Sequence, residues 1–282
     1  MHCFHTIKET RDALNNARAE GQTIGFVPTM GNLHSGHLKL IETAREHADY
    51  VVASIFVNPM QFGPNEDFDA YPRTLERDSE KLIKQGTDLL FAPSATEMYP
   101  FGLDDQIRVG TPDIANVLCG ANRPGHFGGV TTVVCKLFNI IQPDIAVFGE
   151  KDYQQLAIVR KMVADLCMPI NIIPMPTVRE SSGLALSSRN GNLRPTDVEI
   201  APLLHRNLNI NKKKIVSGQR NYVELEREAT EELERNGFEV DYFSICDQRS
   251  LKKASADQQN LVILIAAKLG TVRLIDNIAF SV

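Results

Sequence analysis

The stretch TIGFVPTMGNLHSGHLKLIETAREHADYVVASIFV, residues 23–57, decides the fold. Its first six residues, 23–28, have the character of a strand and lead into a turn that contains glycine and histidine. Residues 36–48 then follow a helical pattern. The apolar face of this helix consists of Leu38, Leu40, Ile41 and Ala44. Residues 50–57 are a continuous apolar run, typical of a parallel strand that is covered on both faces.

Further strands and helices alternate along the chain beyond this unit. Helices are predicted at about 74–85, near 129–141 and at 153–167, and strands at 88–92, 144–148 and 170–177. Alternation at this spacing implies right-handed βαβ units, and the predicted fold is α/β, a Rossmann-like, doubly wound parallel sheet. In such sheets ligands bind at the carboxyl ends of the strands. The residues that follow each strand are therefore the first candidates for function.

The pattern changes from about residue 179. Helices are predicted at 196–208 and 221–236, and strands at 240–246, 261–268 and 271–277, the last two joined tightly around Leu269 and Gly270. Helices followed by antiparallel strands indicate a smaller C-terminal α+β domain. We therefore expect two domains, residues 1–178 and residues 179–282.

Length and composition narrow the class of protein. A hydrophobic fraction of 43% and a charged fraction of 23% are ordinary for a globular chain that buries a full core. The net charge of −5 argues against a general nucleic-acid binder. The N-terminus lacks the apolar stretch of a signal peptide, and no run approaches the ~20 apolar residues that span a bilayer. We expect a cytoplasmic protein with no nucleic-acid or membrane partner.

The five cysteines are odd in number and widely scattered, and none is spaced as CxxC. This usage is typical of reduced, mostly structural thiols, not of a disulfide framework or a zinc site.

The first candidate motif is PTMGNLHSGH, residues 28–37, which follows the first strand and opens a helix. Gly31 and Gly36 leave room for a phosphate or ribose, and free amides at the helix start favour anionic oxygen. His34 and His37 are three residues apart, so one turn directs both imidazoles toward one point. An isolated HxxH pair would more often be solvated or bind metal, but the strand–turn–helix context favours phosphate. This spacing resembles the HxGH signature of the nucleotidyltransferase superfamily.

The second motif is FGEKDYQQ, residues 148–155, again placed after a strand and at the start of a helix. Gly149 allows the turn, and Lys151 offers a positive charge to a phosphate. Asp152 offers an acceptor to a ribose hydroxyl or a metal shell, and Gln155 lies one turn on. The alternative is a solvated helix start that Asp152 caps. The position at the carboxyl end of a strand favours a functional role.

The third motif is LALSSRN, residues 184–190, in which two hydroxyls and a guanidinium suit a polyphosphate. Ser187, Ser188 and Arg189 supply these groups, although a simple polar turn has the same composition. The motif becomes informative because HxGH enzymes commonly close a second loop of this kind over ATP.

Two further segments carry weaker signals. SIFVNPMQF, residues 54–62, places Gln61 at the carboxyl edge of the sheet, where its amide can both donate and accept. Taken alone, Gln61 is better explained as a loop residue. RPGHFGGV, residues 123–130, carries Arg123 and His126 at a helix start, where anion binding and helix capping are equally good explanations.

Taken together, five segments resemble the pantoate–β-alanine ligase (pantothenate synthetase) family. They are PTMGNLHSGH, SIFVNPMQFGPNEDFDAYPRTLERD, RPGHFGGVTTVV, PDIAVFGEKDYQQL and GLALSSRN. The match runs in order through about residues 22–193, LGTVRLIDNIA near the C-terminus also fits, and residues 206–214 resemble the family least. The resemblance implies that ATP and pantoate form an enzyme-bound pantoyl adenylate and pyrophosphate. The amine of β-alanine then displaces AMP to give pantothenate.

The resemblance also implies roles for individual residues. His34, His37, Lys151, Ser188 and Arg189 would offset charge at the phosphates, with His37 in the acid role. ATP would contact Met30, Gly31, His34, Gly36, His37, Gly149, Lys151, Asp152, Val178, Leu186, Ser187, Ser188 and Arg189, with the backbone of Gly149 and Val178 beside the adenosine. Pantoate would be held by Gln61 and Gln155, with Met30 and Arg123 nearby. Residues 179–282 would form a hinged lid over the ATP site.

The resemblance further implies that Mg²⁺ arrives with the triphosphate and that the chain forms a homodimer. No dedicated protein metal site is expected. Two other functions stay open. One is a nucleotidyltransferase that releases a free adenylated product; the other is a non-catalytic nucleotide-binding module. A purely structural interaction protein has no positive feature in the sequence.

Overall fold

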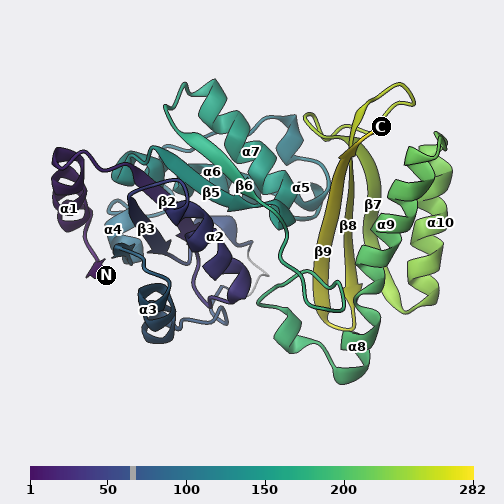
Figure 1. Cartoon of the computed structure of the whole chain (residues 1–282), viewed down its shortest axis with the longest axis horizontal. Coiled ribbons are helices and arrows are strands. Elements are labelled where there is room, and N and C mark those ends of the chain that lie inside the picture. Colours follow the sequence, from purple (N-terminus) through teal and green to yellow (C-terminus); the bar gives the residue numbers. More distant parts are fainter. Residues whose placement is uncertain (64–67) are drawn as a thin grey trace. The chain divides into compact units, whose positions relative to one another are not determined.

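The protein is described by a computed structural model that covers residues 1–63 and 68–282 (Figure 1). The chain divides into two compact units. Unit 1 comprises Met1–Asn116, Gly120–Glu150 and Gln155–Pro176, and unit 2 comprises Val117–Cys119, Lys151–Gln154 and Thr177–Val282. The two-domain prediction with its boundary at residue 178 stays a prediction. Residues 64–67, within the family-like segment 54–78, lie outside the described residues.

Unit 1 contains a six-stranded parallel sheet in the order β1-β4-β3-β2-β5-β6. Its strands are β1 (His2–Phe4), β2 (Ile24–Thr29), β3 (Tyr50–Ile55), β4 (Leu89–Phe91), β5 (Ile145–Gly149) and β6 (Asn171–Met175). From β2, successive strands run outward through β3 on one side, while β5 and β6 lie on the other. The switch point of the doubly wound sheet therefore lies between β2 and β5, where ligands bind in such folds. The predicted α/β fold is confirmed.

The helices of this part of the chain follow the strands in sequence. They are α1 (Ile7–Ala19), α2 (Ser35–Arg45), α3 (Leu75–Lys84), α4 (Ala95–Met98), α5 (Cys119–Asn122), α6 (His126–Ile141) and α7 (Tyr153–Asp165), with short 3₁₀ segments η1 (Pro59–Gln61), η2 (Asp113–Ala115) and η3 (Glu150–Asp152). Within unit 1, α1 packs against α6 and α2 against α3. The sequence pattern did not indicate β1 or α1, and α6 begins three residues before its predicted start.

The pairing of strand β2 determines where the chain turns out of the sheet into the first motif. Ile24, Phe26 and Val27 are fully buried, as the apolar run requires. Pairing with β3 continues along the whole strand, whereas pairing with β5 involves only Gly25 and Phe26. Pro28 lacks a backbone N–H, and it stands where the strand is already paired on one side only. The end of β2 is thus open on the β5 side, and the following turn starts there.

Unit 2 contains a three-stranded antiparallel sheet in the order β7-β8-β9 with helices packed against it. Its strands are β7 (Phe238–Asp247), β8 (Asn260–Leu269) and β9 (Val272–Ser281), and its helices are α8 (Pro195–Ile200), α9 (Leu203–Val216) and α10 (Tyr222–Arg235), preceded by the 3₁₀ segment η4 (Asn190–Asn192). The apolar core between helices and sheet includes Leu204, Leu208, Leu225, Leu233, Phe243, Ile263 and Ile265. The predicted α+β character of this region is confirmed.

The single helix predicted at 196–208 is wrong. The chain forms α8 and α9 instead, separated at Ala201 and Pro202. Pro202 lacks the N–H that would continue α8, and its ring would clash with the preceding turn. It therefore ends one helix and stands directly before the next.

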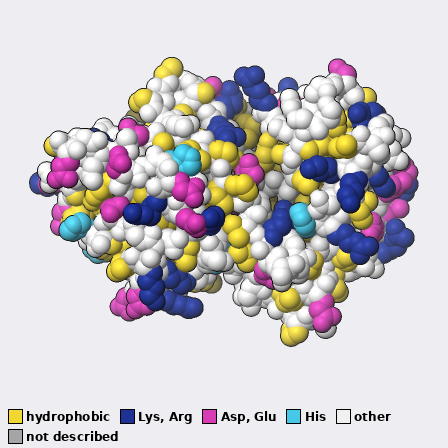
Figure 2. Space-filling model, viewed as in Figure 1, with side chains coloured by type: hydrophobic (Ala, Val, Ile, Leu, Met, Phe, Trp, Pro, Cys, Tyr) yellow, Lys and Arg dark blue, Asp and Glu magenta, His cyan; other side chains and the backbone are white. Residues whose placement is uncertain are grey.

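Acidic and basic side chains are interspersed over the face of the molecule drawn in Figure 2. Among the described residues, no helix combines the length and the apolar character that crossing a bilayer requires.

Candidate active site

The turn that follows β2 has a backbone that requires glycine. Gly31 and Asn32 both adopt left-handed conformations, with φ of 85° and 50°. A Cβ added at Gly31 would lie 3.1 Å from Ile55 Cγ2 and 3.2 Å from Asp78 Oδ2, so both the conformation and the space favour glycine. The Thr29 hydroxyl, 2.7 Å from the Ser54 carbonyl, accepts the Gly31 N–H at 3.2 Å. These contacts fix the start of the turn to β3.

Asp78 on α3 fixes the middle of the same turn. Its carboxylate is fully buried and accepts the N–H groups of Asn32 at 2.7 Å and Leu33 at 2.9 Å. The Thr74 hydroxyl donates to it at 2.9 Å. The Lys81 ammonium lies 3.9 Å away and donates to the Leu33 carbonyl. A buried carboxylate is stable only with such partners.

Sequence reasoning missed Asp78. The available signal was an acidic residue four positions before Leu82, on the face of α3 that is buried.

His34 and His37 form a reciprocal cap at the start of α2. The His34 side chain accepts the Gly36 N–H through Nδ1 at 3.1 Å, and the His37 Nδ1 accepts the His34 N–H at 3.3 Å. The two ring centroids are 4.1 Å apart. Because each Nδ1 is an acceptor, each neutral ring carries its proton on Nε2. Two Nε2–H donors therefore stand side by side after the switch-point strand.

The expectation of free backbone amides in this turn is wrong for four of them. The N–H groups of Asn32 and Leu33 bind Asp78, and those of His34 and Gly36 bind the imidazoles. These four amides are thus used to hold the turn together. The imidazoles are the side-chain donors that the same turn brings together, so the histidines matter more than the sequence suggested.

Gln61, at the end of η1, is held by a buried polar cluster. Its Oε1 accepts the Asn58 Nδ2–H at 3.1 Å, and its Nε2 donates to Met30 Sδ at 3.0 Å. The Tyr99 hydroxyl donates to Asn58 Oδ1 at 2.7 Å. Burial raises the pKa of Tyr99, so its phenol stays a neutral donor. Met30 connects this cluster to the turn of the histidines. Asn58 and Tyr99 received no role from the sequence.

The backbone of helix α6 packs directly against the backbone of η1. A Cβ added at Gly129 would lie 2.2 Å from the Met60 carbonyl oxygen, so only glycine allows this approach. Asn58 Nδ2 also donates to the Gly129 carbonyl at 3.2 Å. The first turn of α6 therefore determines where Gln61 lies.

Arg123 and His126 lie beside the same cluster. His126 Nδ1 is 2.7 Å from the Gln61 carbonyl, and its Nε2 is 3.0 Å from the Arg123 guanidinium. Arginine is always a donor, so His126 accepts at Nε2 and donates from Nδ1. His126 is thus a structural link between Gln61 and Arg123. This placement brings Met30, Gln61 and Arg123 of the predicted acid-binding set together in unit 1.

The second motif follows β5, and its residues are divided between the two units. Gly149 ends β5 in unit 1, and the half-buried Gln155 lies in the first turn of α7. Lys151 and Asp152 belong to unit 2, where the Lys151 carbonyl accepts the Asn277 Nδ2–H at 3.0 Å. Asp152 is exposed.

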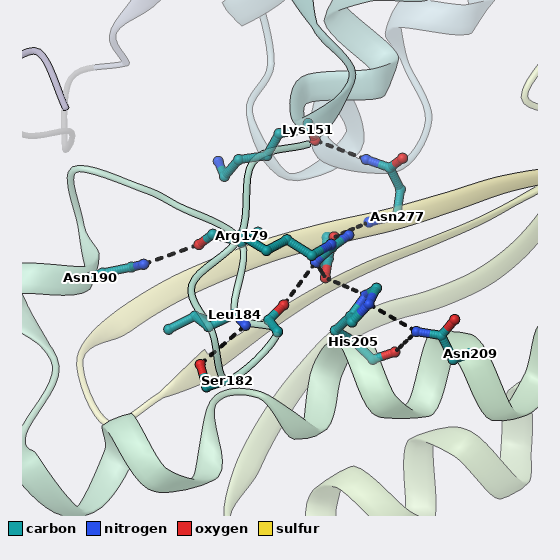
Figure 3. A network of polar contacts seen from close by, with 11 residues as sticks. Lys151, Arg179, Ser182, Leu184, Asn190, His205, Asn209 and Asn277 are labelled. Atoms are coloured by element: carbon teal, nitrogen blue, oxygen red, sulfur yellow. Dashed lines mark hydrogen bonds and ion pairs between the residues drawn. The ribbon is translucent and has the colours of Figure 1, made fainter. Parts of the chain in front are cut away.

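The third motif lies on a small hairpin of unit 2 (Figure 3). Leu186 N–H donates to the Val178 carbonyl at 2.9 Å, and Arg179 forms an antiparallel bridge with Ala185. Beyond the hairpin, the Ser187 hydroxyl accepts the Arg189 N–H at 3.2 Å. Arg189 is exposed. Within the described ranges, neither its guanidinium nor the Lys151 ammonium has an ion-pair partner.

The structure places the predicted site residues in two groups. Unit 1 holds Met30, Gly31, His34, Gly36, His37, Gln61, Arg123, Gly149 and Gln155; unit 2 holds Lys151, Asp152, Val178, Leu186, Ser187, Ser188 and Arg189. Over residues 1–63 and 68–282, no three or more His, Cys, Asp or Glu side chains are grouped to hold a metal ion. The roles of the individual residues stay predictions.

The fold and the first group define a class of protein. A doubly wound parallel sheet with paired imidazole donors at its switch point, beside a buried amide cluster, is suited to bind an anionic substrate next to a small polar one. This arrangement is that of an α/β enzyme acting on a nucleotide or a similar phosphate compound.

Comparison with known proteins identifies the family. A sequence model described as Pantoate-beta-alanine ligase matches residues 2–279. A curated pantothenate synthetase from Saccharophagus degradans is 55% identical over 282 residues, covering 100% of this chain and 99% of that protein. A crystal structure of pantothenate synthetase from Thermus thermophilus superimposes with a TM-score of 0.91 at 46% identity, with 99% of each chain covered.

A third relative was solved with ligands. The pantoate-beta-alanine ligase from Francisella tularensis, complexed with beta-gamma ATP and beta-alanine, has a TM-score of 0.79 and 39% identity, over 99% of this chain and 97% of its own. The present chain belongs to the pantoate–β-alanine ligase family. The predicted family, ligase class and function are confirmed.

Proposed function

We propose that the chain joins pantoate to β-alanine by way of a pantoyl adenylate, with the histidine pair at the phosphates and Gln61 at the acid. The observation that carries this assignment is the pair of Nε2–H donors of His34 and His37, fixed at the switch point beside the Gln61 cluster. The Francisella relative, solved with an ATP compound and β-alanine, supports the choice of substrates.

In the first step a pantoate carboxylate oxygen attacks the α-phosphorus of ATP. A bond forms between the α-phosphorus and the carboxylate oxygen. The bond between the α-phosphorus and the oxygen that bridges to the β-phosphorus breaks, and pyrophosphate leaves. The protein needs no covalent intermediate, so its contribution is to position the reactants and to stabilise the developing negative charge. The Nε2–H groups of His34 and His37 would donate to the phosphate oxygens, and His37 would protonate the leaving group.

Pantoate would lie against Gln61, Gln155 and Met30. The Gln61 amide is held in a fixed orientation by Asn58, which donates to its oxygen, and by the Met30 sulfur. A hydroxy acid offers both donors and acceptors, which suits an amide whose direction is already set. The Arg123 guanidinium, beside His126, would attract the carboxylate.

Lys151, Ser188 and Arg189 of unit 2 would bind the same triphosphate. The Lys151 and Arg189 cations have no ion-pair partner in the described part of the protein, so their charges are not already neutralised by carboxylates. Asp152, Leu186, Ser187 and the backbone of Gly149 and Val178 would contact the nucleotide. Mg²⁺ would enter with ATP as its substrate complex, retaining several waters. The lid role of residues 179–282 is part of this proposal.

In the second step the β-alanine amine attacks the acyl carbon of the adenylate. A C–N bond forms, the C–O bond to AMP breaks, and the amine loses a proton. AMP therefore leaves with one oxygen that came from pantoate. A homodimer, expected from the family, and a cytoplasmic location, expected from the N-terminus and the cysteine usage, belong to the same proposal; light scattering on the purified chain tests the first.

An omission assay tests the function. The chain is incubated with MgATP, pantoate and β-alanine, and each substrate is left out in turn. Pyrophosphate should form with ATP and pantoate alone, in an amount close to the enzyme present, and AMP turnover should require β-alanine. Release of a free adenylated product while β-alanine is present would refute the ligase and favour a nucleotidyltransferase.

A further inference from the structure

Two neighbouring residues of β9, Asp276 and Asn277, make contacts that the proposed reaction steps do not use. Both are buried, although each carries a polar side chain. They stand opposite Ile265 and Leu264 of β8, and successive side chains of a strand point to opposite faces. Each of the two residues therefore reaches a different partner from one short piece of backbone.

Asn277 reaches the second motif. Its Nδ2 donates to the backbone carbonyl of Lys151 at 3.0 Å (Figure 3). Its own N–H donates to Asp276 Oδ1 at 2.8 Å, which couples the two residues. The bond is to the Lys151 backbone, so the ammonium group remains available to a ligand. Asn277 thus fixes the backbone from which the Lys151 side chain extends, and it does not bind the ammonium group.

Asp276 reaches the third motif through Arg179. The two carboxylate oxygens accept from the Arg179 guanidinium at 2.7 and 2.8 Å, the bidentate geometry of strong pairs. The same guanidinium donates to the Gly183 carbonyl at 3.1 Å, which closes the turn of the hairpin. Asn190 then binds the Ala185 carbonyl at 3.0 Å. The segment Leu186–Arg189 is held on both sides by this network.

His205 on α9, drawn with Asn209 in Figure 3, lies next to Asp276. Its Nδ1 lies 3.7 Å from Asp276 Oδ2, and its Nε2 accepts from Asn209 at 3.0 Å. Burial lowers the pKa of His205, and the nearby positive charge of Arg179 lowers it further. The negative charge of Asp276 acts in the opposite direction but is the smaller effect. His205 is therefore neutral near pH 7, and Arg179 is the cation that pairs with Asp276.

We propose that Asp276 and Asn277 are positioning residues that hold Lys151 and the Ser187–Arg189 segment at a fixed separation for the ATP phosphates. This inference rests on the proposed function, because it assigns the two motifs to one triphosphate. Lys151 and Ser187–Arg189 lie on separate segments of the chain. β9 binds the first directly and the second through the hairpin of Arg179. A shift of about 1 Å in such groups costs on the order of a hundredfold in rate.

Asn277→Ala tests the proposal against a matched control. Asn211 is also buried in unit 2, and its Nδ2 donates to a backbone carbonyl, that of Asn207, at the same 3.0 Å. Asn211→Ala therefore removes a similar bond that has no link to Lys151. Urea unfolding gives the stability of both variants. Binding of α,β-methylene-ATP with Mg²⁺ and pantoate-dependent pyrophosphate release give their function.

The expected result is a split between stability and function. Both variants should lose similar stability, but Asn277→Ala should weaken analogue binding about tenfold and slow pyrophosphate release by about ten- to a hundredfold. Asn211→Ala should stay within about twofold of the wild type in both. Equal function in the two variants would overturn the proposal. If Asn277→Ala does not fold, the near-isosteric Asn277→Asp, which turns the donor into an acceptor, takes its place.

A double-mutant cycle shows whether Asn277 acts through Lys151. In a Lys151→Ala background the backbone carbonyl is kept but the ammonium is gone. Asn277→Ala should then change analogue binding by less than about twofold, because the group it positions is absent. An undiminished tenfold effect in that background would refute positioning.

The proposed function can fail separately. If the wild type binds the analogue but makes no pantoate-dependent pyrophosphate, the ligase assignment fails. The binding arm of the cycle still decides the role of Asn277.

Discussion

Replacing Asp78 by asparagine should slow the reaction although Asp78 is buried and is not proposed to contact any of the three substrates. The carboxylate accepts the N–H groups of Asn32 and Leu33, one on each oxygen. Asparagine keeps one acceptor oxygen and turns an NH₂ group toward the other N–H. One buried amide of the turn thus loses its partner, and the segment that leads into His34 has to move.

The structure sets the size of this effect. A hydrogen bond to a charged group contributes about 1.5–3 kcal/mol, and an unsatisfied buried amide costs about 1–3 kcal/mol. These two descriptions concern the same lost bond, so we expect Asp78→Asn to lower the free energy of unfolding by about 2–3 kcal/mol. The turn carries both imidazoles, and a displacement of about 1 Å corresponds to a roughly hundredfold lower kcat.

Asp88→Asn is the control for this experiment. Asp88 likewise accepts a backbone N–H, that of Val51 at 2.8 Å, but this amide belongs to the amino end of β3, away from the turn. Stability is measured by urea unfolding, and kcat by AMP formation under conditions where both variants are folded. Asp78→Asn should lose kcat, whereas Asp88→Asn should lose only stability. A normal kcat in folded Asp78→Asn would refute the role of Asp78 in placing the histidines.

Three further predictions follow from the site and its supports. His37→Ala should lower kcat by about 10²–10⁴-fold with little change in the circular dichroism spectrum, since it removes one Nε2–H donor; wild-type turnover would refute the assigned role. Gly129→Ala should lower stability by about 1–3 kcal/mol and raise the KM for pantoate, because its Cβ would lie 2.2 Å from the Met60 oxygen. The neighbouring Gly128→Ala, whose Cβ meets nothing within 4 Å, should do neither. Burial lowers the pKa of His205, so the folded chain favours the neutral imidazole. The stability that this preference provides is complete above the ordinary pKa of 6.5 and is lost as the pH falls below it. His205→Gln should therefore flatten the fall in stability between about pH 7.5 and about pH 5.5, measured by urea unfolding, and an unchanged fall would contradict this.

The sheet of unit 1 was predictable because its buried strands are long apolar runs separated by amphipathic helices. Strand β1 has only three residues, His2–Phe4, too few for a recognisable period. The break between α8 and α9 was signalled by Pro202, but the apolar periodicity on both sides concealed it. Local patterns thus predicted the main elements, and they failed where an element was short or interrupted.

The candidate site divides in the same way. His34 and His37 follow the strand β2, so local sequence pointed to them, whereas Gln61 was proposed only through the resemblance to the family. Asp78 acts on amides 46 and 45 positions earlier, and Asn277 acts on a carbonyl 126 positions away. No local pattern carries such partnerships, since they depend on which segments the fold brings together. The use of four turn amides inside the protein was hidden from the sequence for the same reason.

The most direct test of the central claim follows one oxygen atom. Pantoate labelled with ¹⁸O in both carboxyl oxygens is converted with MgATP and β-alanine, and the products are analysed by mass spectrometry. Attack of the carboxylate on the α-phosphorus predicts one labelled oxygen in AMP and one in pantothenate. Label in inorganic phosphate, with ADP as the nucleotide product, would show attack on the γ-phosphorus and would contradict an adenylate-forming ligase.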